Sequence, residues 1–99
     1  MPAGASGKKA VQAVITGTVQ GVWFRGWTIE NAQSRGLHGW VRNRKDGTVE
    51  ACFAGPADLV EDMIAACRTG PPTSVVESVA VGEMADEGWN RFVQLPTTE

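Results

Sequence analysis

The sequence contains no apolar run of the roughly 18 residues that a membrane-spanning helix requires. Residues 1–9 also lack the apolar stretch of a secretory signal peptide, so we expect a cytoplasmic protein with no membrane partner. A formal net charge of −2 and an isoelectric point near 5.3 leave no excess of positive charge. Because nucleic-acid-binding domains present a basic face, we expect no nucleic-acid partner either.

Metal-binding patterns are also missing from the sequence. The only cysteines, Cys52 and Cys67, show neither the C-x-x-C nor the Cys/His spacing of a zinc site, so we expect no metal and no cofactor. Two cysteines can form a disulfide, but reduced structural thiols are the preferred interpretation, with Cys67 in the core. The single histidine, His38, is interpreted as a surface residue.

The composition that is present is typical of one small globular domain. Of the 99 residues, 42% are hydrophobic and 20% are charged, which suffices for one modest core. The small residues of segment 1–8 predict disorder, and 9–97 is predicted to form the domain. We expect this domain to be a monomer.

Apolar alternation, helical spacing and turn residues divide the domain into strands and helices. Strands are predicted at 10–16, 37–43, 48–54, 74–83 and 91–95, and helices at 25–35 and from Pro56 to the Gly70-Pro71-Pro72 stop. Asp46 and Gly47 are predicted to form a hairpin turn, because Asp-Gly supplies the positive φ that such turns need. In strand 48–54, we expect Glu50 to point outward. In strand 74–83, either Val75 or Val76, followed by Val79 and Val81, supplies the apolar positions.

The order of these elements predicts an α+β fold, βαββαβ with a short fifth strand. Two crossovers that each skip a strand give an antiparallel sheet in the order 4-1-3-2, with two helices on one face and the fifth strand at an outer edge. In this topology strands 10–16 and 37–43 are parallel, so they end at the same rim of the sheet. The turn at 18–24, Arg25 and Asn43 are therefore predicted to lie together.

The turn between the first strand and the first helix has the composition of an anion site. Gly17 and Gly21 flank a tight turn whose backbone N–H groups can point inward beside the N-terminal end of the helix. Arg25 can hold a phosphate through two parallel hydrogen bonds. A Walker-type loop would add a lysine and a Ser/Thr ligand for magnesium, and this turn has neither. The pattern predicts a cradle for one phosphoryl group without a metal.

Neither the turn nor the hairpin offers a nucleophile. Segments 19–25 and 40–47 contain no serine, cysteine or histidine, so the group that attacks a bound phosphate would be water. Asn43 is the candidate that orients this water, because its amide can both accept and donate a hydrogen bond.

Each of these residues also has a structural interpretation. Asn43 can cap the hairpin, and Arg25 can be an ordinary surface residue of the helix. Tryptophans can indicate a base-stacking or apolar groove, but we interpret Trp40 as sheet packing and expect Trp23 and Trp27 to be partly exposed beside the turn. The predicted coincidence of turn, arginine and asparagine favours the functional interpretation.

Segments 17–25 (GTVQGVWFR) and 39–50 (GWVRNRKDGTVE) resemble the two sequence motifs of the acylphosphatase family. The resemblance covers about residues 10–95. It implies the ferredoxin-like fold and the metal-free hydrolysis of the carboxyl–phosphate bond of small acyl phosphates. By the motif match, Arg25 takes the family's phosphate-binding role and Asn43 its water-orienting role.

An acyl phosphate carries a good leaving group, so the enzyme must position water and stabilise phosphoryl charge rather than supply a general acid. The residues expected to hold the phosphate are Gln20, Gly21, Val22, Trp23, Phe24 and Arg25. Inorganic phosphate or sulfate is expected to compete for the same cradle.

A non-catalytic binding module on the same fold is the alternative from a different class. Strand 48–54 lacks the K/R-G-F/Y-G/A-F-V-x-F/Y segment of RNA-binding domains, which disfavours RNA. A sensor of small anions or of carbamoyl phosphate stays open, since a phosphate cradle need not turn over. Release of phosphate from an acyl phosphate separates the enzyme from the sensor.

Overall fold

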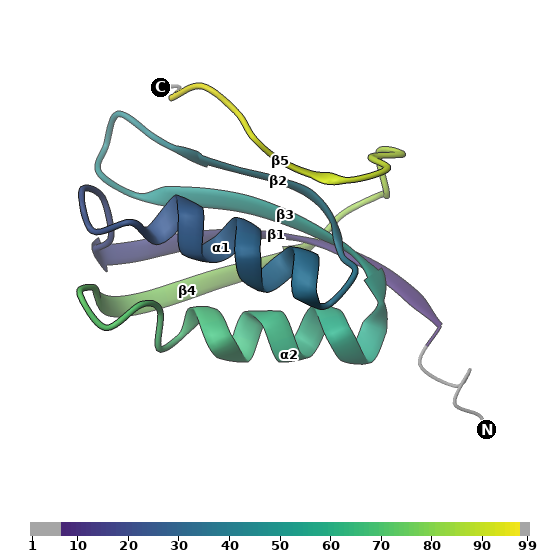
Figure 1. The fold of residues 1–99 in the computed structure, drawn as a ribbon. Coiled ribbons are helices and arrows are strands. Elements are labelled where there is room, and N and C mark those ends of the chain that lie inside the picture. The colour runs from purple at the N-terminus through teal and green to yellow at the C-terminus, as the bar shows by residue number, and fades with distance from the viewer. Residues whose placement is uncertain (1–6, 98–99) are drawn as a thin grey trace.

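The computed structural model describes residues 7–97, in which five strands and two helices follow one another in the predicted order (Figure 1). They are β1 (Lys8–Thr18), α1 (Phe24–Ser34), β2 (His38–Asn43), β3 (Val49–Pro56), α2 (Ala57–Cys67), β4 (Val75–Glu83) and β5 (Phe92–Gln94). Of the segment predicted to be disordered, residues 1–6 lie outside the described residues, and Lys8 already belongs to β1. Among residues 7–97, no helix is long and apolar enough to cross a membrane.

The five strands form one sheet in the order β4-β1-β3-β2-β5, with both helices packed on the same face (Figure 1). β3 is antiparallel to β1 and to β2, so β1 and β2 run in the same direction and end at the same rim. β5 pairs in parallel with the outer side of β2. The predicted fold class, the 4-1-3-2 order and the fifth edge strand are all confirmed.

The core lies between the sheet and the two helices. α1 buries Phe24, Thr28 and Ala32, whereas α2 buries Val60, Met63 and Cys67. Burying each large apolar side chain contributes about 1.5–3 kcal/mol to folding. This packing fixes the N-terminal end of α1 against the sheet, and the predicted anion site lies at that end.

Glu50 points to the face of the sheet without helices, as the alternation of strand 48–54 predicts, but it is not exposed to solvent: only 7% of the residue is accessible. The reason is that β3 is a central strand with neighbours on both sides. Gln12 of β1 donates a hydrogen bond to one carboxylate oxygen of Glu50, and Arg42 Nε of β2 donates to the other at 2.9 Å. The guanidinium of Arg42 also lies 4.7 Å from the ring centroid of Trp40.

The end of β3 and the burial of β4 differ from the sequence-based expectation. β3 continues through Gly55 and Pro56, where a break was expected, because the long β1 pairs with it as far as Lys8↔Pro56. In β4, Val79 is buried and Val76 packs against the core, as expected, but Val75 and Val81 are 61% and 43% exposed. β4 is an edge strand with a single neighbour, so several of its side chains have no element to pack against.

Candidate active site

The loop between β1 and α1, the first turn of α1, and the ends of β2 and β5 line a pocket of about 250 Å³. The loop and helix contribute Val19, Gly21, Trp23, Phe24, Arg25 and Gly26. Asn43 at the end of β2 and Gln94 at the end of β5 complete the lining. The structure thus brings Arg25 and Asn43 into one pocket, as the parallel course of β1 and β2 predicts.

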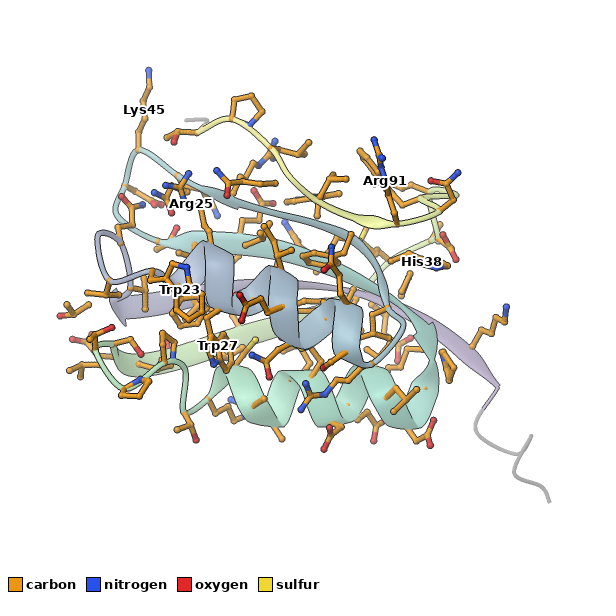
Figure 2. All side chains as sticks on the ribbon, in the orientation of Figure 1. Trp23, Arg25, Trp27, His38, Lys45 and Arg91 are labelled. Carbon is orange, nitrogen blue, oxygen red and sulfur yellow. The ribbon has the colours of Figure 1, made fainter. Side chains whose placement is uncertain are left out.

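Arg25 is half-buried in the first turn of α1 and lies near Trp23 at the N-terminal end of the helix (Figure 2). Within residues 7–97, its guanidinium has no carboxylate partner and no hydrogen-bond acceptor. Arg35, directly after α1, differs, because its guanidinium pairs with Asp62 at 2.8 Å. Arg25 therefore presents its donors to the pocket.

Asn43 carries a buried side-chain oxygen, Oδ1, that has no hydrogen-bond partner within the described residues. The interpretation of Asn43 as a hairpin cap does not explain this, since other groups make the bonds of the turn. Arg44 N donates to Thr48 O at 2.9 Å, and Thr48 N and Oγ1 both donate to Asp46 Oδ1. The same Thr48 bonds lower the pKa of Asp46.

The loop of the pocket has an unusual backbone. Gly21 has φ +75° and Trp23 has φ +67° and ψ +20°, so two residues of the left-handed region flank Val22. Alternation between the two hands is typical of backbone concavities whose N–H groups point at an anion. The first N–H groups of α1 add to them, because the first turn of a helix has no intrahelical acceptors for its donors.

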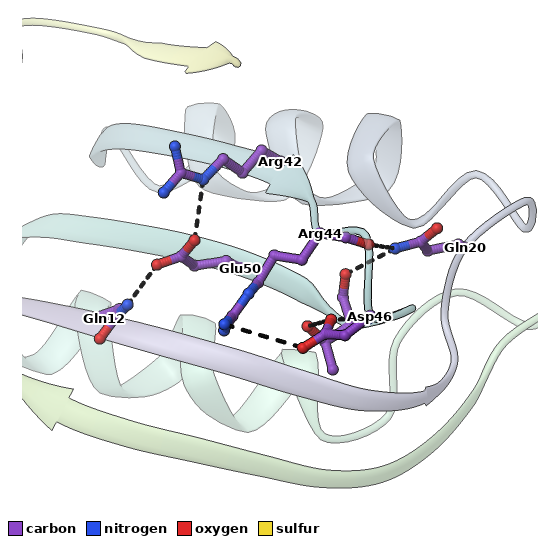
Figure 3. A network of polar contacts seen from close by, with 7 residues as sticks. Gln12, Gln20, Arg42, Arg44, Asp46 and Glu50 are labelled. Carbon is purple, nitrogen blue, oxygen red and sulfur yellow. Dashed lines mark hydrogen bonds and ion pairs between the residues drawn. The ribbon is translucent and has the colours of Figure 1, made fainter. Parts of the chain in front are cut away.

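Three hydrogen bonds from two side chains hold this loop against the rest of the fold. Gln20 Nε2 donates to Arg44 O at 2.7 Å and to Thr48 O at 2.8 Å (Figure 3). On the other side, Thr73 Oγ1 donates to Val22 O at 2.8 Å. Of the residues predicted to hold the phosphate, all except Gln20 and Val22 line the pocket. That the backbone N–H groups of this loop bind the phosphate stays a prediction.

Arg42 and Arg44, which the sequence places close to Asn43, do not add positive charge to the pocket. Successive strand residues point to opposite faces, so both arginines lie on the face without helices (Figure 3). There Arg42 pairs with Glu50 and Arg44 with Asp46. Arg25 is thus the cation in the lining of the pocket.

Comparison with known proteins decides the family. The family model described as acylphosphatase matches residues 11–93. An acylphosphatase of Rhizorhabdus wittichii is 57% identical over 83 residues, which cover 84% of each chain. The chain belongs to the acylphosphatase family. The predictions of an enzyme and of this family are confirmed.

Solved acylphosphatase structures agree with the fold as well as with the family. The crystal structure of acylphosphatase from Bacillus subtilis is 37% identical, superimposes with a TM-score of 0.84, and is matched over 87% of this chain and 97% of its own. An acylphosphatase from Coxiella burnetii is 28% identical with a TM-score of 0.87, and the match covers 96% of this chain and 100% of the other. The ferredoxin-like fold of the acylphosphatases is therefore the fold of this chain.

Gln94 is a lining residue that sequence reasoning missed. It lies opposite Val41 in the parallel pairing of β2 with β5, and Asn43 is two residues further along β2 on the same face. Only the register in which β5 pairs with β2 brings Gln94 to the pocket, and this register depends on contacts between distant segments. No sequence motif around residue 94 predicts that Gln94 lines the pocket.

The cysteines and the histidine are not among the residues that line this pocket. Both cysteines are free and buried; burial is the main cause that raises the pKa of Cys52 to about 11 and that of Cys67 to about 12. His38 is exposed at the opposite end of β2 (Figure 2). Within residues 7–97, no group of three or more His, Cys, Asp or Glu side chains could hold a metal ion.

Proposed function

We propose that this acylphosphatase hydrolyses the carboxyl–phosphate bond of small acyl phosphates in the pocket lined by Arg25 and Asn43, without a metal. One observation carries the proposal. Among the described residues, a guanidinium without an acceptor and a buried amide oxygen without a donor line the same 250 Å³ pocket. A phosphoryl group supplies the acceptor that Arg25 lacks, and a water molecule supplies the donor that Asn43 lacks.

The phosphoryl group binds through charge and backbone donors. Arg25 donates two parallel hydrogen bonds to phosphoryl oxygens, a geometry that its planar guanidinium favours. The backbone N–H groups of residues 20–25 bind the remaining oxygens, supported by the left-handed residues Gly21 and Trp23. These preorganised donors stabilise the charge that spreads over the equatorial oxygens during phosphoryl transfer.

Asn43 orients the attacking water. Its Oδ1, which has no partner among the described residues, accepts a hydrogen bond from the water, and its Nδ2 donates to a phosphoryl oxygen. When the water is held in line with the bond to be broken, its attack becomes an effectively unimolecular step within the bound complex. Asn43 cannot take a proton at neutral pH, so it acts by position alone.

The reaction balances without a protein base. The water oxygen forms a bond to phosphorus, and the bond between phosphorus and the acyl oxygen breaks, with its electron pair leaving on the carboxylate. A proton of the water passes to a phosphoryl oxygen of the substrate. Because the carboxylate is a weak base, its departure needs no general acid.

Further expectations rest on the same proposal. Inorganic phosphate and sulfate compete for the cradle, since they match the phosphoryl group in charge and shape. The physiological setting that we propose is a cytoplasmic monomer without a metal or another cofactor.

The test is the release of inorganic phosphate from acetyl phosphate and from benzoyl phosphate by the purified protein. Phenyl phosphate, whose phenolate is a poorer leaving group, serves as the comparison substrate. We expect rapid turnover of both acyl phosphates and negligible turnover of the ester. Binding of both acyl phosphates without release of phosphate would contradict the proposal and favour a sensor.

A further inference from the structure

Trp23 is an exposed tryptophan at the edge of the phosphate pocket. It is 58% exposed and also contributes to the pocket lining. Among the described residues, the other large hydrophobic side chains with high exposure are Val75 and Val81 on the edge strand β4. Ligand pockets are lined mainly by hydrophobic and aromatic side chains, and a tryptophan offers a large, rigid apolar surface to a bound group.

Trp23 keeps this position in an unfavourable backbone conformation. Its φ of +67° lies in the left-handed region, which side chains with a Cβ rarely adopt, and Trp23 is the only non-glycine residue in 7–97 with positive φ. As the N-cap of α1, it also provides no side-chain hydrogen bond to the helix. Neither helix capping nor core packing explains why a tryptophan occupies this position.

Gly26 holds the indole ring of Trp23 in a defined place. A Cβ at Gly26 would lie 2.2 Å from Trp23 Nε1 and 2.8 Å from Cδ1 and Cε2, so the ring rests directly on the backbone of α1. Glycine is a poor helix former, yet it occupies the first turn of α1. Because Gly26 has no side chain, the indole ring of Trp23 can pack against the backbone of α1 at this position.

These observations place a fixed aromatic surface beside the phosphate cradle. A substrate whose phosphoryl group is bound by Arg25 must extend its acyl group from the cradle toward the pocket edge. We propose that Trp23, seated on Gly26, binds the acyl group by ring stacking, so that the preferred substrates are acyl phosphates with flat, apolar acyl groups. This inference rests on the proposed function, because it assigns the acyl part of the same substrate.

The experiment compares kcat/KM for benzoyl phosphate, which has a flat ring, with kcat/KM for acetyl phosphate, which has only a methyl group. The readout is the ratio of the two values. In Trp23→Ala, we expect the benzoyl-to-acetyl ratio to fall about 5- to 10-fold, the size of one aromatic stacking interaction. In Trp23→Phe, most of the ratio should be retained.

Gly26→Ala tests the position of the Trp23 ring without removing the ring. The new methyl group must displace the indole, whereas alanine favours the helix, so we expect the ratio to fall while the melting temperature is kept. Trp89→Ala is the matched control, since Trp89 precedes Arg91, which lies at the opposite end of the sheet (Figure 2). Its ratio should equal that of the parent protein.

Each outcome decides the inference. An equal fall for both substrates in Trp23→Ala, or an unchanged ratio in Trp23→Ala and Gly26→Ala, would overturn it while leaving the proposed function intact. If the parent protein released phosphate from neither substrate, the proposed function would fail and the inference with it. If Trp23→Ala does not fold, Trp23→Phe and Gly26→Ala still give the ratio.

Discussion

The side-chain amide of Gln20 is hydrogen-bonded to the backbone carbonyl of Arg44 at 2.7 Å. The two residues belong to the two segments of the pocket, because Gln20 precedes the left-handed loop and Arg44 directly follows Asn43. A second bond from the same amide reaches Thr48 O at 2.8 Å. One side chain therefore joins the loop of the proposed phosphate cradle to the hairpin that follows Asn43, for which we propose the water-orienting role.

Loss of this bridge should impair turnover more than folding. In Gln20→Ala, the loop and the hairpin can move apart, and we expect kcat/KM to fall about 10-fold, since small misplacements of reacting groups are costly. Gln20→Glu replaces the donor with an acceptor that faces two carbonyl oxygens, so its loss should be greater. The measurements are kcat/KM for benzoyl phosphate and the melting temperature.

Gln12→Ala is the matched control for this prediction. Gln12 donates its hydrogen bond to Glu50 on the face of the sheet without helices (Figure 3). Its removal should lower the free energy of unfolding by about 1.5–3 kcal/mol, as for other hydrogen bonds to a charged group, and leave kcat/KM unchanged. Equal kinetics for Gln12→Ala and Gln20→Ala would show that the bridge has no part in positioning.

Arg25 should be indispensable for binding the phosphoryl group. We expect Arg25→Ala to lower kcat/KM by about 10³-fold or more, as with other groups that stabilise transition-state charge. Arg25→Lys should recover little, since an ammonium lacks the planar pair of donors. The fold should survive, because the guanidinium makes no bond to the described part of the chain. Turnover close to the parent value in Arg25→Ala would remove this residue from the site.

Activity should not depend on divalent metals. We expect kcat/KM to be the same after treatment with EDTA and after addition of magnesium, because Arg25 and backbone donors supply the charge stabilisation. Inorganic phosphate should inhibit competitively and raise the melting temperature, since it binds the folded state alone. Inactivation by EDTA that one added metal reverses would contradict the mechanism.

The two buried thiols predict a loss of stability at high pH. Their pKa values in the folded protein, about 11 for Cys52 and about 12 for Cys67, lie above the ordinary 9.0. The unfolded chain therefore releases these protons first, and the free energy of unfolding falls as the pH rises above 9. Each thiol contributes up to about 1.4 kcal/mol per pH unit in this range.

Urea unfolding of the parent protein and of the Cys52→Ala/Cys67→Ala variant at pH 7, 9 and 10.5 measures this loss. The variant is expected to be less stable at pH 7, because of the space left in the core, but to lose less stability between pH 9 and 10.5. Parallel curves for the two proteins would show that the thiols do not cause the decline.

The positions of Arg25 and Asn43 were predictable from sequence because they follow from topology. Two crossovers make β1 and β2 parallel, and this alone brings the segments after them to one rim. The Asp46-Gly47 turn is equally local, with φ +94° at Gly47 as an Asp-Gly hairpin requires. Such features can be predicted without knowing which side chains are in contact.

The burial of Glu50 and the contribution of Gln94 could not be predicted in the same way. The exposure of Glu50 depends on Gln12 and Arg42, which lie on two other strands. Gln94 joins the pocket because β5 pairs with β2 in one particular register. The same holds for Gln20, which the motif places at the phosphate but whose side chain bonds the hairpin. The burial of Glu50, the place of Gln94 and the hydrogen bonds of Gln20 all depend on contacts between distant segments, which local sequence patterns do not reveal.

The kinetics of Asn43→Asp, measured beside Asn43→Ala, test the mechanism most directly. The account predicts that Asn43→Ala lowers kcat by about 10²-fold or more with a much smaller change in KM, since water placement is lost and phosphate binding is kept. Asn43→Asp should be at least as damaging and should also raise KM, because its carboxylate repels the phosphoryl group and cannot donate a hydrogen bond. Retention of most activity in Asn43→Asp, where a general base would have been introduced, would contradict the water-orienting role.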